Sequence, residues 1–256
     1  MLHALCFMII ITMLSFLIKI KGIGLDILFP SLCLNCGKTL IHADEKADEH
    51  GYAKFLCADC YALIKLNIAL FCPVCRARLP DQRKICHRDS PYLLAAASSY
   101  DNPVIQNLIR YFKYKSFRNL APFLGKITAQ YIENCKLKIE NFIVIPIPLH
   151  PSRERKRGFN QAHLLAEFTA GHFKLQLING LKRIANNKPQ VGLKDNETRV
   201  KNVLNCFEIK NPELVRGKNI ILVDDVFTSG ATMNEAVRVL KTAGAKRIIA
   251  LTLAKA

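Results

Sequence analysis

The stretch that decides the fold is Ile220-Ile221-Leu222-Val223-Asp224-Asp225-Val226-Phe227-Thr228-Ser229-Gly230-Ala231-Thr232. Its apolar first part predicts a buried strand over residues 219–223, which carries two adjacent carboxylates to its carboxyl end. A hydroxyl-rich turn follows and leads into a helix predicted over residues 232–243, which Gly244 ends. Backbone N–H groups at such a helix start bind phosphate, helped by the helix dipole. Because two carboxylates that can accept hydrogen bonds from sugar hydroxyls lie just upstream, we predict a ribose 5-phosphate site rather than a simple helix cap.

The chain around this stretch alternates helices and strands from about residue 91 onward. Apolar residues at helical spacing predict helices over 104–115 and 120–135. A further helix is predicted through residue 168, capped by Asn160, and β-branched runs predict strands over 142–146 and 248–253. This order predicts an α/β fold whose parallel sheet has right-handed crossovers. Ligands in such sheets bind at the carboxyl ends of the strands.

The quoted segment resembles the phosphoribosyl-pyrophosphate (PRPP) loop of type I phosphoribosyltransferases, although Phe227 is bulkier than the aliphatic residue common there. The resemblance implies a type I phosphoribosyltransferase fold for residues 91–256. It also implies that Asp224 and Asp225 contact the ribose 2- and 3-hydroxyls. The 5-phosphate would be held by Thr228, Ser229, Gly230, Ala231 and Thr232.

A second basic segment follows the strand predicted over residues 142–146. Its cations are Arg153, Arg155, Lys156 and Arg157, in what we predict to be a mobile loop. Arginine makes bidentate contacts with phosphate, so this loop is interpreted as a pyrophosphate clamp. Mg²⁺ is expected to bridge the polyphosphate with few protein ligands. A solvated basic loop and a nucleic-acid patch are the alternatives.

Seven of the ten cysteines lie between residues 33 and 86, and they include three CxxC pairs. Paired CxxC spacing in an α/β protein predicts zinc and a reducing cytoplasm rather than disulfides. The zinc-ribbon module is predicted over residues 31–90, with one structural Zn²⁺ on Cys33, Cys36, Cys57 and Cys60. A second, less complete site is predicted on Cys72, Cys75, Cys86 and Asp89. His87 is the rival fourth ligand, and occupancy of this second site stays open.

Residues 1–30 form an apolar leader, and three interpretations of it stay open. Translation can begin at Met13, the leader can be a membrane-associated helix at the inner face of the membrane, or it can be a secretory signal. The last is the poorest match, because no basic residue precedes the apolar run and no clear small-residue cleavage site follows it.

A basic and aromatic stretch runs from Arg110 to Arg118, in a chain with a formal net charge of +17. Its candidate nucleic-acid contacts are Arg110, Lys113, Lys115 and Arg118. Single-stranded nucleic acid is bound by such interleaved cations and aromatic rings. The favoured alternative is an amphipathic helix end with its aromatic rings in the core, because Phe112 continues the apolar face.

Several motifs together resemble the ComF family, which is associated with natural competence and pairs a zinc module with a phosphoribosyltransferase domain. They are Pro148-Leu149-His150-Pro151, Arg157-Gly158-Phe159-Asn160-Gln161, Lys188-Pro189-Gln190-Val191-Gly192-Leu193 and Arg199-Val200-Lys201-Asn202-Val203, and the resemblance covers residues 25–256. It implies a DNA-uptake factor that binds PRPP and single-stranded DNA, with proteins of the uptake machinery as partners. The alternative is an active phosphoribosyltransferase that transfers ribose 5-phosphate to a nitrogenous acceptor.

Overall fold

The computed structural model describes residues 31–40, 51–79, 86–87, 90–114, 117–185 and 203–256. The chain divides into two compact units, Met1–Tyr61 and Ala62–Ala256. The predicted leader over residues 1–30 lies outside the described residues. The sequence analysis grouped all these cysteines in one zinc-ribbon module over residues 31–90. Cys72, Cys75 and Cys86 instead fall in the unit Ala62–Ala256, together with the sheet.

The first unit is built around two cysteine turns. A β-bridge joins Leu32 to Thr39, and between them the Gly37 N–H donates to the Cys33 carbonyl at 2.9 Å. The second turn leads into helix α2 (Ala58–Ala62). The Leu34 N–H donates to the Phe55 carbonyl at 2.8 Å, which ties the two turns together.

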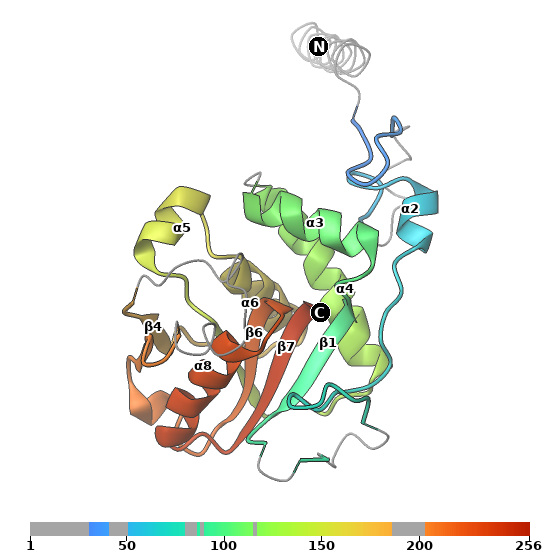
Figure 1. The fold of residues 1–256 in the computed structure, drawn as a ribbon. Helices are drawn as coiled ribbons and strands as arrows, with labels where there is room; N and C mark the ends of the chain where they lie inside the picture. Colours follow the sequence, from blue (N-terminus) through green and yellow to red (C-terminus); the bar gives the residue numbers. More distant parts are fainter. Residues whose placement is uncertain (1–30, 41–50, 80–85, 88–89, 115–116, 186–202) are drawn as a thin grey trace, which may run out of the picture. The chain divides into compact units, whose positions relative to one another are not determined.

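A five-stranded parallel sheet forms the centre of the second unit, in the order β1-β7-β6-β2-β3 (Figure 1). Its strands are β1 (Leu93–Ser99), β2 (Phe142–Pro146), β3 (Gln176–Leu177), β6 (Asn219–Phe227) and β7 (Arg247–Lys255). The predicted parallel α/β sheet is therefore confirmed. Strand β1 was missed, because its alanines and serines have low β propensity. Burial explains why it forms, since its first six residues are buried.

Helices cover both faces of this sheet (Figure 1). The described helices of this unit are α3 (Pro103–Tyr114), α4 (Ala121–Asn134), α5 (Pro151–Arg157), α6 (Gln161–His172) and α8 (Ala231–Thr242), with short 3-10 turns η1 (Arg118–Leu120) and η2 (Pro212–Leu214). The helix α5 projects away from the sheet rather than covering one of its faces (Figure 1). Four of the five match predicted helices to within a few residues. The predicted cap of α6 is confirmed, because the Asn160 side chain accepts a hydrogen bond from the Ala162 N–H at 3.1 Å.

Alternate residues of the strands pack against different helices, as the period of two in a strand requires. On one face Leu222 and Ala250 belong to a core that includes Ala236 and Leu240 of α8. Helices α4 and α6 pack against the sheet and against each other on the other side. A small antiparallel ribbon, β4 (Leu181–Arg183) and β5 (Phe207–Ile209), packs beside α8.

Strands β2 and β6 are neighbours whose connections leave in opposite directions. The chain goes from β2 through α6 to β3 at the edge, and from β6 through α8 to β7 on the inner side. Right-handed crossovers that run in opposite directions place their helices on opposite faces of the sheet. The carboxyl ends of β2 and β6 therefore open a crevice, which is where parallel sheets bind ligands.

Among the described residues, no helix combines the length and the apolar character that crossing a bilayer requires.

Candidate phosphate-binding site and metal-ligand clusters

A cavity of about 460 Å³ lies at the carboxyl ends of β1, β2 and β6. Tyr100 lines it after β1, Ile147 to Leu149 line it after β2, and residues 224–228 line it from β6 and the loop that follows. The prediction of a site at this edge of the sheet therefore corresponds to a real cavity. Its volume is in the range of sites for small-molecule ligands.

The phosphate loop, residues 228–232, forms one wall of the cavity. Thr228, Gly230, Ala231 and Thr232 line it, whereas the Ser229 hydroxyl accepts a hydrogen bond from the Ala231 N–H at 3.4 Å. Gly230 has a φ of 81° and precedes the first residue of α8. A Cβ at this position would lie 2.7 Å from the Phe227 ring, so the bulky ring and the glycine fit each other.

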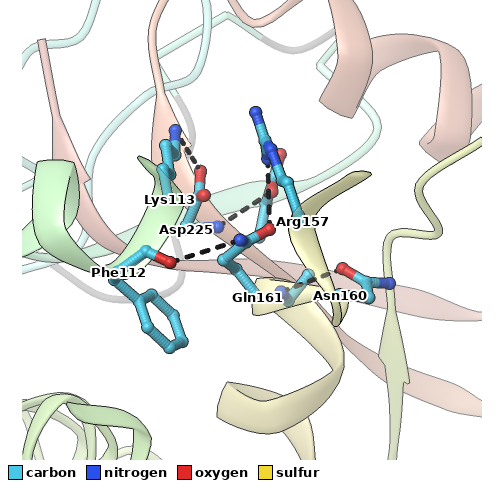
Figure 2. A network of polar contacts seen from close by, with 8 residues as sticks. Phe112, Lys113, Arg157, Asn160, Gln161 and Asp225 are labelled. Carbon is cyan, nitrogen blue, oxygen red and sulfur yellow. Dashed lines mark hydrogen bonds and ion pairs between the residues drawn. The ribbon is translucent and has the colours of Figure 1, made fainter. Parts of the chain in front are cut away.

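The two carboxylates lie inside β6 rather than beyond it, because the strand continues to Phe227. Successive side chains of a strand point to opposite faces, so Asp224 and Asp225 have different surroundings. Asp225 forms an ion pair with Lys113 of α3, with 2.9 Å between Nζ and Oδ1 (Figure 2). The Asp224 carboxylate accepts a hydrogen bond from the Asp225 N–H at 2.8 Å. Burial and the neighbouring Asp225 carboxylate raise the pKa of Asp224 to about 7, against the opposing effect of Lys113.

Lys113 lines the cavity. The sequence analysis had instead named it as a candidate contact with nucleic acid in a basic and aromatic stretch. Its side chain is 20% exposed, and burial works against the charge that its ion pair stabilises. The attraction of Asp225 outweighs the effect of burial, so the pKa of Lys113 is raised. No spacing pattern in the sequence around Lys113 indicates that Asp225 is its partner, because the two residues are far apart along the chain.

The other members of that stripe have different positions. Arg110 is exposed and also lines the cavity, Arg118 is exposed in η1, and Lys115 lies outside the described residues. Phe112 is fully buried, which confirms the core interpretation for that ring. Tyr114 and Phe117 are exposed, and the Arg157 guanidinium lies 5.7 Å from the centroid of the Tyr114 ring.

The predicted mobile basic loop is wrong in its conformation, since most of it forms the helix α5. His150 caps the helix and Pro151 starts it, a position where proline loses no hydrogen bond. Arg153 and Arg157, one helical turn apart, line the cavity, while Arg155 and Lys156 are exposed and are not among its lining residues. The predicted clamp is thereby divided between two faces of a helix.

Arg157 is held at the cavity by a short relay. Its guanidinium donates to the Gln161 side-chain oxygen at 3.1 Å, and the Gln161 amide donates to the Phe112 carbonyl at 3.4 Å (Figure 2). The relay links α5, α6 and α3 next to the Lys113–Asp225 ion pair.

Arg183 is a charged cavity residue that sequence reasoning missed. It is 7% exposed at the end of β4 and stacks on the Phe207 ring, with 5.4 Å between guanidinium and ring centroid. Burial and the charges of Arg183 and Arg157 lower the pKa of Arg153. Three guanidinium groups therefore share one side of the cavity and favour an anion there.

The first metal-ligand cluster unites Cys33, Cys36, Cys57 and Cys60, whose sulfur atoms all lie within 4.8 Å of one another. The sulfur atoms of Cys36 and Cys57 are 3.7 Å apart. Two thiolates on a tetrahedral zinc ion would be about 3.8 Å apart, given a Zn–S bond of about 2.3 Å. Burial raises the pKa of Cys33, but hydrogen bonds from the backbone of Cys36 and Cys57 outweigh it and lower the pKa to about 6. The four residues fit a metal ion such as zinc.

The second cluster unites Cys72, Cys75, Cys86 and His87. His87 Nδ1 lies 3.4 Å from the Cys72 sulfur, and the sulfur atoms of Cys75 and Cys86 are 3.3 Å apart. The predicted ligand Asp89 lies outside the described residues. The rival ligand His87 is thus the one that the described part of the chain brings to the three cysteines, and three sulfurs with one imidazole also suit zinc.

Comparison with known proteins agrees with this architecture. A family model described as a phosphoribosyl transferase domain matches residues 162–256. Competence protein ComFC of Bacillus subtilis is 31% identical over 201 residues, 74% of this chain and 79% of the relative. Competence protein F of Haemophilus influenzae is 31% identical over 216 residues, 78% of this chain and 90% of the relative. The DNA utilization protein YhgH of Salmonella typhimurium is 26% identical over 206 residues, 75% of this chain and 87% of the relative.

The sheet, the loop and the cysteine clusters define a protein with a phosphoribosyl transferase domain and two sets of potential metal ligands. Within that class, the chain belongs to the ComF family of competence proteins.

Proposed function

We propose that this protein binds PRPP in the cavity at the sheet edge and acts as a competence-type factor that handles incoming single-stranded DNA. One observation carries the PRPP proposal: a phosphate loop, two carboxylates and three arginines surround a single cavity. PRPP presents a 5-phosphate, sugar hydroxyls and a pyrophosphate, which are the chemical partners of those three groups.

In this proposal the loop residues 228–232 bind the 5-phosphate, and Asp224 and Asp225 accept hydrogen bonds from the ribose hydroxyls. Arg153, Arg157 and Arg183 bind the pyrophosphate, with bidentate geometry available to each guanidinium. The Lys113 ammonium already neutralises one of the two carboxylates. Mg²⁺ would therefore arrive on the polyphosphate and take few protein ligands.

Removal of both carboxylate charges tests the site. We expect Asp224→Asn with Asp225→Asn to weaken PRPP binding at least about tenfold in calorimetry with Mg²⁺, since each lost charge-assisted hydrogen bond costs roughly 1.5–3 kcal/mol. Glu140→Gln is the control, because Glu140 is an exposed acid just before β2, at the opposite edge of the sheet. Equal PRPP affinity in the double variant and the wild type would refute the assignment.

Single-stranded DNA is the second proposed ligand. Exposed Arg110 and Arg118 lie close in sequence to exposed Tyr114 and Phe117, which supports backbone charge contacts with base stacking. The names of the relatives, which refer to competence and DNA utilization, support the same role. Proteins of a DNA-uptake machinery are the partners that this role requires.

Zinc held by thiolates requires reduced cysteines, which favours the cytoplasm as the compartment.

Transfer of ribose 5-phosphate to a nitrogenous acceptor is the alternative. The buried Lys113–Asp225 pair favours it, because a positioned ammonium and carboxylate beside the sugar site can serve proton transfer. A screen for pyrophosphate release from PRPP with candidate bases separates the two functions. Release with one acceptor would establish transfer, whereas tight PRPP binding without release supports a ligand-sensing role.

A further inference from the structure

Arg76 closes the turn that carries two ligands of the second metal-ligand cluster. The Arg76 N–H donates to the Cys72 carbonyl at 2.8 Å, and the Cys72 N–H donates to the Ala77 carbonyl at 2.9 Å. Arg76 has a φ of 61°, which is uncommon for a residue other than glycine. The base of the turn is fixed to the sheet, because Phe71 and Leu94 exchange backbone hydrogen bonds.

The Arg76 side chain leaves this turn and contacts the phosphate loop. One terminal nitrogen donates to the Thr228 carbonyl at 2.7 Å, and the other donates to the Ala256 carbonyl at 2.9 Å. Its guanidinium also lies 6.0 Å from the centroid of the Phe227 ring, the ring that packs under Gly230. The Ala256 N–H in turn donates to the Phe227 carbonyl at 2.9 Å. Arg76 therefore joins the metal-ligand turn, the start of the phosphate loop and the residue that follows β7.

We propose that Arg76 is a positioning residue that couples metal occupancy of the Cys72, Cys75, Cys86 and His87 cluster to the conformation and anion affinity of the phosphate loop. The affinity part of this inference rests on the proposed function of the loop. The coupling itself concerns only contacts within the unit Ala62–Ala256.

Peptide geometry explains how one guanidinium can orient the loop. In a trans peptide the C=O and the following N–H point in opposite directions. While Arg76 holds the Thr228 carbonyl, that carbonyl cannot turn into the anion site, and the Ser229 N–H points away from Arg76. The guanidinium also places a positive charge directly behind the loop, which favours a bound phosphate.

Metal binding is relevant to Arg76 because the turn that carries it also carries Cys72 and Cys75, two of the four potential metal ligands. The Cys75 sulfur lies 3.3 Å from the Cys86 sulfur, and the Cys72 sulfur lies 3.4 Å from His87 Nδ1, so a bound metal would tie the turn at two points to residues 86 and 87. Loss of the metal would remove the tie between this turn and residues 86 and 87, and would loosen the turn that presents Arg76. The loop would then lose the hydrogen bond to Thr228 without any change in its own sequence.

The test compares Arg76→Gln with Arg78→Gln, a control that removes the same charge from an exposed position two residues further along. We expect Arg76→Gln to speed amide hydrogen exchange in the peptide covering residues 226–233 and to weaken PRPP binding about tenfold, as for a lost charge-assisted hydrogen bond. Arg78→Gln should leave both unchanged. Metal content, measured on both variants, should equal that of the wild type.

Metal removal provides the second arm. Chelation of the wild type should speed exchange in the same peptide, and chelation of Arg76→Gln should add nothing further there. Unchanged exchange and PRPP affinity in Arg76→Gln would overturn the inference, as would an equal effect of chelation in variant and wild type. If the wild type binds no PRPP while Arg76→Gln still speeds loop exchange, the proposed function fails and the coupling stands. If chelation unfolds the protein, the exchange and affinity of the metal-loaded variant decide.

Discussion

At the scale of single residues, the two carboxylates of the site have unequal surroundings although they are adjacent in sequence. Asp225 forms an ion pair with Lys113 of α3, whereas the Asp224 carboxylate accepts a hydrogen bond from the Asp225 N–H, and burial together with the Asp225 charge raises the pKa of Asp224 to about 7. Asp224 therefore binds a proton in the folded state over a pH range where the unfolded chain has already released it. This difference makes stability depend on pH.

The sign of that dependence follows from proton linkage. Because the folded-state pKa of Asp224 lies above its ordinary value of 3.8, the free energy of unfolding should fall as pH rises from about 4 to about 7 and level off above that. The loss attributable to Asp224 is roughly 2 to 4 kcal/mol. Urea unfolding of the wild type and of Asp224→Asn across pH 4 to 8 measures it. A constant difference between the two proteins over this range would contradict the assignment.

At the scale of elements, the phosphate loop is a turn whose shape depends on one glycine and one ring. Gly230 combines a φ of 81° with a Cβ position only 2.7 Å from the Phe227 ring. Gly217 has a similar φ of 69°, but nothing lies within 4 Å of its Cβ position. The two glycines thus separate the cost of backbone conformation from the cost of the close contact.

Gly217→Ala should lower the free energy of unfolding by about 1 kcal/mol, the cost of a left-handed conformation for alanine. Gly230→Ala should cost roughly 1–3 kcal/mol more, because the new methyl group clashes with Phe227. It should also weaken PRPP binding. Urea unfolding measures the loss of stability in each variant. The double variant Gly230→Ala with Phe227→Leu should recover part of the stability lost in Gly230→Ala. Equal losses in the two alanine variants would show that the ring contact is unimportant.

At the scale of the whole molecule, a net charge of +17 predicts that any nucleic acid binds with a strong dependence on salt. Arg110→Gln and Arg118→Gln should each make the slope of log affinity against log salt less steep by about 0.7, if each arginine contacts one phosphate of a single strand. Fluorescence anisotropy with an oligonucleotide gives the slope. Arg216→Gln is the control, since it removes an equal charge from an exposed pair with Glu213. An unchanged slope in both variants would rule out this surface.

The sequence alone determined the parallel α/β sheet, the phosphate loop and the first four-cysteine cluster, because these depend on local periodicity and on short spacings along the chain. Helix boundaries moved by only a few residues for the same reason. The basic segment was predicted in the wrong conformation, since charge in sequence does not reveal that it forms the helix α5, in which two of its four cations are not among the residues that line the cavity.

Only the tertiary structure assigned Lys113 to Asp225, brought Arg183 to the arginine side of the cavity and linked Arg76 to Thr228. Each of these contacts joins residues far apart in the chain, and each involves a side chain whose neighbours in sequence have no fixed pattern. Their partners are decided by how the strands are ordered and on which face each connection returns. Strand order and connection faces are properties of the folded sheet, and the spacing of residues over short stretches of sequence does not determine them.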